Sequence, residues 1–459
     1  MFPKDFLWGA SISAMQAEGS IDNRGLTFAD LRSQQMNKDL GYADTSVAVD
    51  FYHHYKEDIQ LMKECGFKSF RMSIAWSRIF PNNSTDINQE GVDFYHSVFD
   101  ELNKNNIEPI VTLFHFDMPY WMAKKYNGFV SRQAINDFVA YSKFCFEEYG
   151  NKVKYWLTIN EQTVLAFIPS LQGLKNFKET YQAFHHMSLA NAKVIKLYHS
   201  MNLNGKIGPC ISYSTTYPAS CDPQDIRLAF FQDDLMVFSL CDVHMYGKYP
   251  QYFLNWLKEM NCEFKMELGD EEILKDAIPD FFGLNWYCTE VIGKYIEEDS
   301  FGNYDGPDMP RQSRTLKGVY QYYKNPHTPY SEYNWNNDGI GLHYSLRKMY
   351  DRYHIPLLIT ENGWSANETL GDDGKIHDIE RIDYFKNMVE GMEEALNDGV
   401  ELMGFNPWSF IDVTSSSQGM NKRYGLVFVD RTNEDIKECA RIPKDSYYWY
   451  KETIEKYTK

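Results

Sequence analysis

The chain has 459 residues, of which 43% are hydrophobic and 16% aromatic, so it can bury a large core. Its formal net charge is −18, and a surface this acidic argues against nucleic acid or an anionic membrane as the main partner. No apolar stretch reaches the roughly 18 residues that a membrane span requires.

The cysteines and the first residues of the chain bear on its location. The eight cysteines are scattered without a C-x-x-C pair, which is typical of reduced thiols rather than of a disulfide framework or a zinc site. Residues 1–9 lack the basic-then-apolar order of a signal peptide. We therefore expect a cytoplasmic protein.

A short β-rich run followed by a longer amphipathic stretch recurs along the chain, without a linker, a repeat or a low-complexity block. The predicted strands are Phe6–Ser11, Ser69–Ile74, Glu108–His115, Lys154–Glu161, Lys206–Ser212, Asp280–Tyr287, Pro356–Gly363 and Glu401–Phe410. The predicted helices include Val49–Cys65, Ser131–Tyr149 (with Ser131 as its cap), Thr180–Ser200, Gly341–Arg352 and Ile379–Asn397.

Eight such units predict an α/β fold, a closed (β/α)8 TIM barrel in which residues 1–459 form a single domain. The active-site groups should lie at the carboxyl ends of the strands, and long loops at that face are expected at Asn23–Thr45, Ser212–Asp233 and Ile296–Asn337. The alternative is an open doubly wound sheet, which is disfavoured because no Gly-rich phosphate loop follows the first strand.

Two of the predicted strands end in a glutamate, Glu161 and Glu361. A charge at the end of a buried strand is costly unless it has a partner or a task. Two glutamates that face each other across a cavity are what cleavage of a glycosidic bond requires. With the carboxyls ~5–5.5 Å apart, one attacks the anomeric carbon and the other protonates the leaving oxygen.

Polar and aromatic groups accompany most of the remaining strands. Arg71 lies inside a predicted core strand and needs an anion beside it, such as a nucleophilic carboxylate. Tyr287 can donate its hydroxyl to the same carboxylate. Groups suited to a sugar stand at other strand ends: hydrogen-bonding side chains at Gln16, His115 and Asn160, and a flat apolar ring at Trp408.

These segments together resemble family 1 of the glycoside hydrolases, the β-glucosidase and 6-phospho-β-glycosidase group. The similar segments are Phe6–Ser11 with Gln16 and Glu18-Gly19, Phe70–Arg78, His115–Pro119, Thr158–Glu161, Gly283–Asn285 and Ile359–Gly363. The resemblance implies a retaining mechanism with Glu361 as nucleophile and Glu161 as acid/base. It also implies that Gln16, His115, Asn160 and Trp408 hold the sugar, that Arg71, Asn285 and Tyr287 tune the carboxylates, and that Trp335 lies on the aglycone side.

The stretch after the eighth strand bears on the substrate. In the family's plain glucosidases a Glu-Trp pair follows that strand and binds the far edge of the sugar, whereas this chain has Thr414-Ser-Ser-Ser417 and then Lys422-Arg-Tyr424. A carboxylate there would repel a phosphate, while hydroxyls, an ammonium and a phenol can donate to one. The pattern is similar to the Ser…Lys-x-Tyr signature of the 6-phospho-β-glycosidases, with Ser415 or Ser416, Lys422 and Tyr424 at the matching positions.

We therefore expect retaining hydrolysis of small 6-phospho-β-D-glucosides, without a cofactor or a metal. Two alternatives stay open: a plain β-glucosidase or β-galactosidase, and a barrel that binds glycosides without cleaving them. A metal hydrolase is disfavoured, because the adjacent pairs His53-His54 and His185-His186 point in different directions on a helix. A homo-oligomer also stays open, since no stretch of the sequence identifies an interface.

Overall fold

The structure is a computed structural model that describes residues 1–459 except 168–172, 175, 297–314 and 316–317. In this described part, eight strands form one parallel sheet in the order β1-β11-β10-β7-β5-β4-β3-β2. They are β1 (Leu7–Trp8), β2 (Ser69–Ser73), β3 (Glu108–Phe114), β4 (Tyr155–Asn160), β5 (Lys206–Ser212), β7 (Phe282–Asn285), β10 (Leu357–Glu361) and β11 (Leu402–Phe405).

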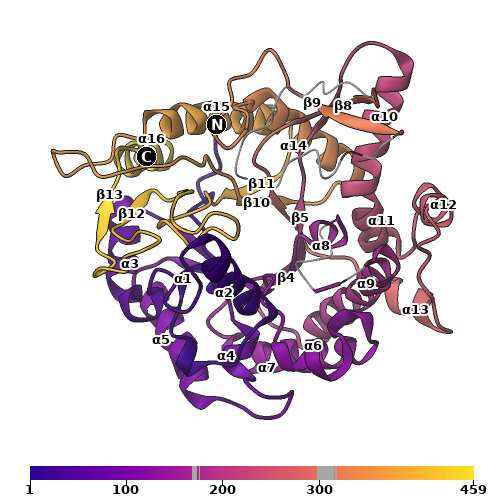
Figure 1. The fold of residues 1–459 in the computed structure, drawn as a ribbon, viewed down its shortest axis with the longest axis horizontal. Coiled ribbons are helices and arrows are strands. Elements are labelled where there is room, and N and C mark those ends of the chain that lie inside the picture. The colour runs from indigo at the N-terminus through magenta and orange to yellow at the C-terminus, as the bar shows by residue number, and fades with distance from the viewer. Residues whose placement is uncertain (168–172, 175, 297–314, 316–317) are drawn as a thin grey trace.

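The two outermost strands of this sheet, β1 and β2, also meet each other. Arg71 N donates to Ala10 O and Ile12 N donates to Arg71 O, both at 2.9 Å, so the sheet closes on itself. Figure 1 shows the strands at the centre with the helices as an outer ring. The closed sheet confirms the predicted (β/α)8 barrel and excludes the open doubly wound sheet.

The helices of the described residues lie mainly outside the strands. They are α1 (Ala14–Ala17), α2 (Phe28–Leu40), α3 (Phe51–Cys65), α4 (Trp76–Ile79), α5 (Gln89–Lys104), α6 (Tyr120–Tyr126), α7 (Gln133–Tyr149), α8 (Gln162–Phe167), α9 (Phe177–Ser200), α10 (Pro223–Asp233), α11 (Ser239–Tyr246), α12 (Gln251–Glu259), α13 (Asp270–Leu274), α14 (Gly339–Tyr353), α15 (Ile379–Asn397) and α16 (Asp445–Thr458). The shorter elements are the 3-10 helices η1 (Ile21–Asn23) and η2 (Gly128–Val130) and the π-helix η4 (Asp234–Phe238).

The five predicted helices are present, and most of the differences lie at their first turns. Helices α9 and α14 begin earlier than predicted because Asn176 and Asp338 cap them, each accepting a backbone N–H with its side chain. Helix α7 begins at Gln133, with Arg132 in the cap position, and Ser131 Oγ accepts from Gln133 N at 3.3 Å.

The long segments predicted as loops contain regular structure where they are described. Residues 23–45 hold α2, which begins with a reciprocal capping box between Thr27 and Asp30. Residues 212–233 hold α10 and β6 (Thr216–Pro218), which pairs with β8 (Glu290–Lys294); β8 in turn pairs with β9 (Tyr320–Tyr323). Most of the third segment, residues 297–314 and 316–317, lies outside the described residues.

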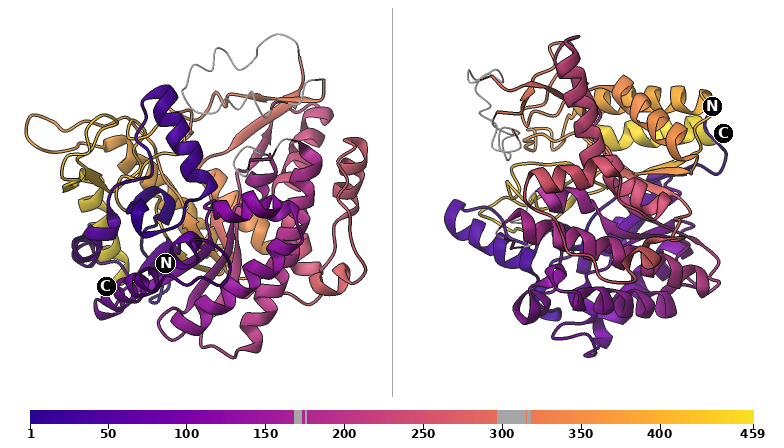
Figure 2. Two further views of the ribbon diagram at one scale, coloured as in Figure 1. Left: turned by 60° about the horizontal axis from the view of Figure 1, so that its bottom comes forward. Right: turned by 90° about the vertical axis from the view of Figure 1, so that its right-hand side faces the viewer.

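The chain ends pack together on the barrel, as Figure 2 shows. The rings of Phe2 and Tyr457 lie 4.7 Å apart, and the rings of Trp8 and Tyr457 stack at 5.8 Å. Strands β12 (Val427–Val429) and β13 (Arg441–Pro443) form an antiparallel pair before α16.

Side chains fill the barrel in layers, and the layers position the site. An apolar layer is formed by the fully buried Ile110, Leu157, Cys210, Phe281 and Leu358. Polar side chains project from later positions of the same strands, nearer their carboxyl ends. Such layering is typical of TIM barrels, in which the carboxyl-end layer carries the chemistry.

Two further observations concern the environment of the chain. Within the described residues, none of the helices combines the length and the apolar character needed to cross a lipid bilayer. All eight cysteines are free thiols, and seven of them are buried while Cys221 is exposed.

Candidate active site

Glu361 is the last residue of β10, and both of its carboxylate oxygens are held. Arg71 Nη1 donates to Oε1 in a buried ion pair, and the Tyr287 hydroxyl donates to Oε2 at 2.6 Å. Two charge-assisted bonds of this kind fix the orientation of the carboxylate.

Arg71 is fully buried and uses the remainder of its guanidinium to join neighbouring strands. Its Nε donates to Thr112 Oγ1 at 2.9 Å and its Nη2 donates to Asn160 Oδ1 at 2.7 Å. Burial on its own would lower the pKa of Arg71, but the charge of Glu361 raises it above its usual value. The cation therefore stays charged beside Glu361.

Glu161 follows β4 directly and adopts a left-handed backbone conformation, with φ of 49°. A non-glycine residue in that region costs of order 1–3 kcal/mol, and such strain is concentrated at functional sites. Asn285 Nδ2 donates to Glu161 Oε1 at 2.7 Å and lies 3.1 Å from Asn160 Oδ1. A continuous chain of hydrogen bonds thus runs from Glu161 to Glu361.

Both carboxylates affect the pKa of the Tyr287 hydroxyl. Burial, then the charge of Glu361 and then that of Glu161, raise the pKa of Tyr287 well above its usual value. Its hydroxyl therefore stays protonated and remains a donor. That both charges act on one hydroxyl indicates that the two glutamates, 200 residues apart in the sequence, lie at one site.

His115 lies on the other side of Glu361. Its Nε2 is 3.3 Å from Asn160 Nδ2 and 3.7 Å from Glu361 Oε1, and its ring stacks on Trp408 with centroids 5.7 Å apart. Burial, and then the charge of Arg71, lower the pKa of His115 well below its usual value. The imidazole is therefore neutral and can exchange hydrogen bonds with a sugar hydroxyl.

A cavity of about 350 Å³ lies over this polar layer. The predicted site residues that line it are Gln16, Glu161, Tyr287, Trp335, Ser415, Ser416, Lys422 and Tyr424. The remaining predicted residues are buried beside or beneath it: Arg71, His115, Asn160, Asn285, Glu361 and Trp408. The side chain of Gln16 is fixed, because its Nε2 donates to Thr414 O at 3.0 Å.

One end of the cavity is built from a cation, aromatic rings and hydroxyls. Lys422 Nζ lies 4.4 Å from the ring centre of Trp335, 5.0 Å from that of Tyr333 and 5.5 Å from that of Tyr424. Ser415 Oγ is 3.1 Å from the Tyr424 hydroxyl. Ser415 is buried and Ser416 exposed, and both line the cavity. Trp335, predicted on the aglycone side, thus also touches the ammonium.

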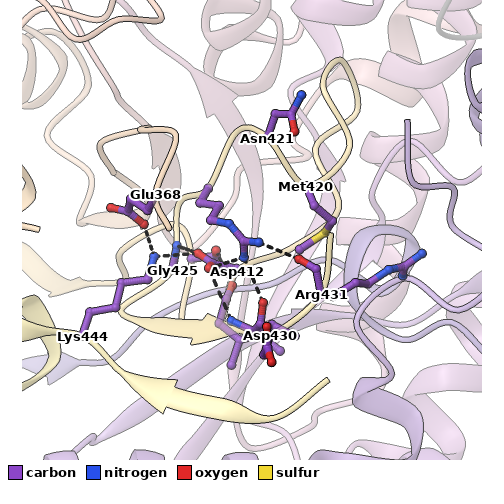
Figure 3. Close-up of polar contacts among 12 residues, drawn as sticks. Glu368, Asp412, Met420, Asn421, Gly425, Asp430, Arg431 and Lys444 are labelled. Carbon is purple, nitrogen blue, oxygen red and sulfur yellow. Dashed lines mark hydrogen bonds and ion pairs between the residues drawn. The ribbon is translucent and has the colours of Figure 1, made fainter. Parts of the chain in front are cut away.

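The loop that carries Lys422 is anchored from behind by buried charges, shown in Figure 3. Asp412 is fully buried and accepts from Arg423 Nη1 at 2.9 Å and from Lys444 Nζ at 2.8 Å. Lys444 also pairs with Glu368. Arg423 is held by these contacts and does not line the cavity, whereas its neighbours Lys422 and Tyr424 do.

A helix face that was not predicted also lines the cavity. Ala29, Arg32, Ser33 and Met36 of α2 are spaced so that they share one side of the helix, and all four are lining residues. The capping box at Thr27 and Asp30 is the sequence signal that would have identified this helix.

Residues 1–458 match the model of glycosyl hydrolase family 1. The chain belongs to this family. Aryl-phospho-beta-D-glucosidase BglH of Bacillus subtilis (strain 168) is 40% identical, with 99% of this chain and 97% of that protein aligned. 6-phospho-beta-glucosidase AscB of Escherichia coli (strain K12) is 36% identical, with 99% of this chain and 98% of that protein aligned. The solved family 1 β-glucosidase from Thermotoga maritima superposes with a TM-score of 0.87 at 29% identity, covering 99% of this chain and 98% of that one.

Membership of family 1 confirms the resemblance of the sequence segments and shows that the chain is a glycoside hydrolase. The expectation of an enzyme is therefore confirmed, and the alternative of a barrel that only binds glycosides falls away. In this family 1 enzyme, the polar layer of Arg71, Asn160 and Asn285 joins the two strand-end glutamates into one unit.

Proposed function

We propose that the enzyme hydrolyses 6-phospho-β-D-glucosides with retention of configuration. The observation that supports this most strongly is the cluster of Lys422, Tyr424 and Ser415 at one end of the cavity. Hydroxyls and an ammonium stand where plain glucosidases of the family carry a glutamate, and such donors suit a phosphate. Relatives named 6-phospho-β-glucosidase and aryl-phospho-β-D-glucosidase are consistent with the proposal.

In the proposed first step, Glu361 attacks the anomeric carbon while protonated Glu161 gives its proton to the leaving oxygen. The bond from the anomeric carbon to that oxygen breaks as the glycosyl ester to Glu361 forms. Arg71 and Tyr287, each bonded to one oxygen of Glu361, hold it in a fixed orientation.

In the proposed second step, Glu161 takes a proton from water, whose oxygen attacks the same carbon. The ester to Glu361 breaks and the sugar 6-phosphate leaves with its original anomeric configuration. Asn285 positions Glu161 in both steps through its 2.7 Å hydrogen bond.

The remaining predicted residues hold the sugar in this proposal. Gln16, Asn160 and neutral His115 bind hydroxyls, and Trp408, stacked with His115, supports the pyranose ring. Trp335 borders the aglycone side as well as the ammonium of Lys422.

A phosphorylated glucoside also suits a cytoplasmic enzyme, because sugar phosphotransferase import systems deliver their sugars phosphorylated inside the cell. Seven buried free thiols are compatible with that location. We also propose that residues 1–459 form one domain, since the family match covers residues 1–458 and the barrel strands extend from residue 7 to residue 405.

The test compares 4-nitrophenyl β-D-glucoside with its 6-phosphate under the same conditions. We expect kcat/KM to be at least roughly tenfold higher for the phosphorylated substrate, because one charge-assisted hydrogen bond is worth about 1.5–3 kcal/mol. Faster cleavage of the unphosphorylated glucoside would reject the proposal in favour of a plain β-glucosidase.

A further inference from the structure

The inference concerns Arg32, which lies on the face of α2 that lines the catalytic cavity. Figure 1 shows α2 near the mouth of the barrel. The segment after α2 is bound to the loop that carries Ser415 and Lys422, because the Tyr42 hydroxyl donates to Gln418 Oε1 at 3.1 Å. Arg32 therefore belongs to a cavity wall that adjoins the serine-rich loop.

Arg32 is half-buried and differs in its partners from three fully buried arginines of this protein. Arg71, Arg78 and Arg381 each pair with a buried carboxylate. Among the residues that the structure describes, none forms a hydrogen bond or ion pair with the side chain of Arg32. The carboxylate nearest in sequence, Asp30, is occupied by Arg24 at 2.6 and 2.7 Å.

Leaving a half-buried guanidinium unpaired is unfavourable, and burial accordingly lowers the pKa of Arg32. The sequence contains 64 Asp and Glu residues, so the composition does not explain why Arg32 has no carboxylate partner among the described residues. A ligand that brings its own negative charge removes this penalty when it enters the cavity.

The neighbouring Ser33 supplies a second donor on the same wall. Its Oγ accepts from Thr45 N at 3.2 Å, which leaves the hydroxyl hydrogen for another acceptor. Glu161 and Glu290 also line the cavity, so an anionic ligand needs nearby positive charge to enter it.

We propose that Arg32, assisted by Ser33, binds an anionic group of the substrate as a second cation of the cavity that Lys422 also lines. This rests on the proposed function, since it concerns recognition at the same site. The planar fork of a guanidinium matches a phosphate or a carboxylate with two parallel hydrogen bonds. The anion is either the 6-phosphate of the sugar or an acidic substituent on the aglycone.

The experiment measures kcat/KM for wild type, Arg32→Met and Arg32→Lys. The substrates are 4-nitrophenyl β-D-glucoside, its 6-phosphate, and a 6-phosphorylated aryl glucoside with a carboxylate on the aryl ring. The matched control is Lys38→Met, which removes a positive charge from the exposed face of the same helix.

If Arg32 binds the sugar phosphate, Arg32→Met loses roughly ten- to a hundred-fold on both phosphorylated substrates and keeps its activity on the plain glucoside. If Arg32 binds an aglycone anion, only the carboxylated substrate shows that loss. In either case Arg32→Lys recovers part of the lost kcat/KM, and the kcat/KM of Lys38→Met differs from wild type by less than about twofold.

The inference would be overturned if kcat/KM of Arg32→Met changed equally on all three substrates or did not change. The same loss of kcat/KM in Lys38→Met would also overturn it. Should Arg32→Met not fold, Arg32→Lys and the inhibition constant of glucose 6-phosphate against both proteins give the same comparison. If wild type itself cleaves the plain glucoside faster, the proposed function fails, whatever Arg32 does.

Discussion

Replacing Asp412 with asparagine tests whether the buried charges behind Ser415, Lys422 and Tyr424, the proposed phosphate-binding residues, hold them in position. Asp412 sits between two buried cations, Arg423 and Lys444, and accepts from both. Burial on its own would raise the pKa of Asp412, but the charges of Lys444 and Arg423 bring it below its usual value. The carboxylate is thus ionised in the fold, and Asp412→Asn removes a charge while keeping the shape.

The loss in the free energy of unfolding can be worked out from the two cations that Asp412→Asn leaves without a charged partner at this position. Removing one partner of a buried ion pair costs about 3–5 kcal/mol, because the other charge stays buried without compensation. Lys444 retains Glu368, but Glu368 is already shared with Arg381, so it offsets only part of the loss. We expect a destabilisation near 3 kcal/mol and a melting temperature several degrees lower.

The same substitution should change substrate recognition, because residues 411–426 carry Ser415, Lys422 and Tyr424, which we propose bind the phosphate. The assay pairs thermal unfolding with KM for 4-nitrophenyl β-D-glucoside and for its 6-phosphate. We expect KM to rise for the phosphorylated substrate more than for the plain one. The control is Asp430→Asn, which breaks the partly exposed pair with Lys437 and should cost less than about 1 kcal/mol. Equal effects of the two substitutions on stability and on KM would refute the positioning role.

Three further predictions concern single residues. Lys422→Met should lower kcat/KM on the 6-phosphate roughly ten- to a hundred-fold, mainly through KM, and leave the plain glucoside unaffected, because the ammonium binds a part of the substrate that does not react; equal losses on both would contradict this. Glu361→Gln should lose turnover by orders of magnitude and still bind glucose 6-phosphate, as calorimetry can show, since the amide keeps the shape of the site; retained turnover would exclude the mechanism. Asp117→Asn should raise the melting temperature relative to wild type at pH 8 but not at pH 4. Burial raises the pKa of Asp117 to about 7, above its unfolded value of about 4, so wild type loses stability as pH rises through that window. A difference between the two proteins that is the same at both pH values would contradict this assignment.

The sequence predicts the barrel strands and the central charges well because both depend on local pattern. A buried apolar run that ends in glutamate marks Glu161 and Glu361, and a lone arginine inside a core strand needs an anion. The structure places Arg71 beside Glu361 accordingly. Tyr287 contacts Glu361 and Asn285 contacts Glu161, as the resemblance implies for residues that tune the carboxylates.

What the sequence does not predict depends on pairs of residues that are distant along the chain. No local pattern in the sequence distinguishes Asp412, Glu368 and Lys444 from other charged residues. Their ion pairs form only because the fold brings them together. The position of Trp335 against Lys422 is of the same kind. Helix α2 is different, since its capping box was readable but lay within a segment interpreted as a loop.

Trapping the covalent intermediate tests the central claim most directly. The reagent is 2-deoxy-2-fluoro-β-D-glucosyl fluoride 6-phosphate, whose fluorine at C2 destabilises the oxocarbenium-like transition state while fluoride leaves readily. Digestion and mass spectrometry should find the fluorosugar phosphate attached to Glu361. Attachment to another residue, or turnover without any covalent adduct and with an inverted product, would contradict the double displacement.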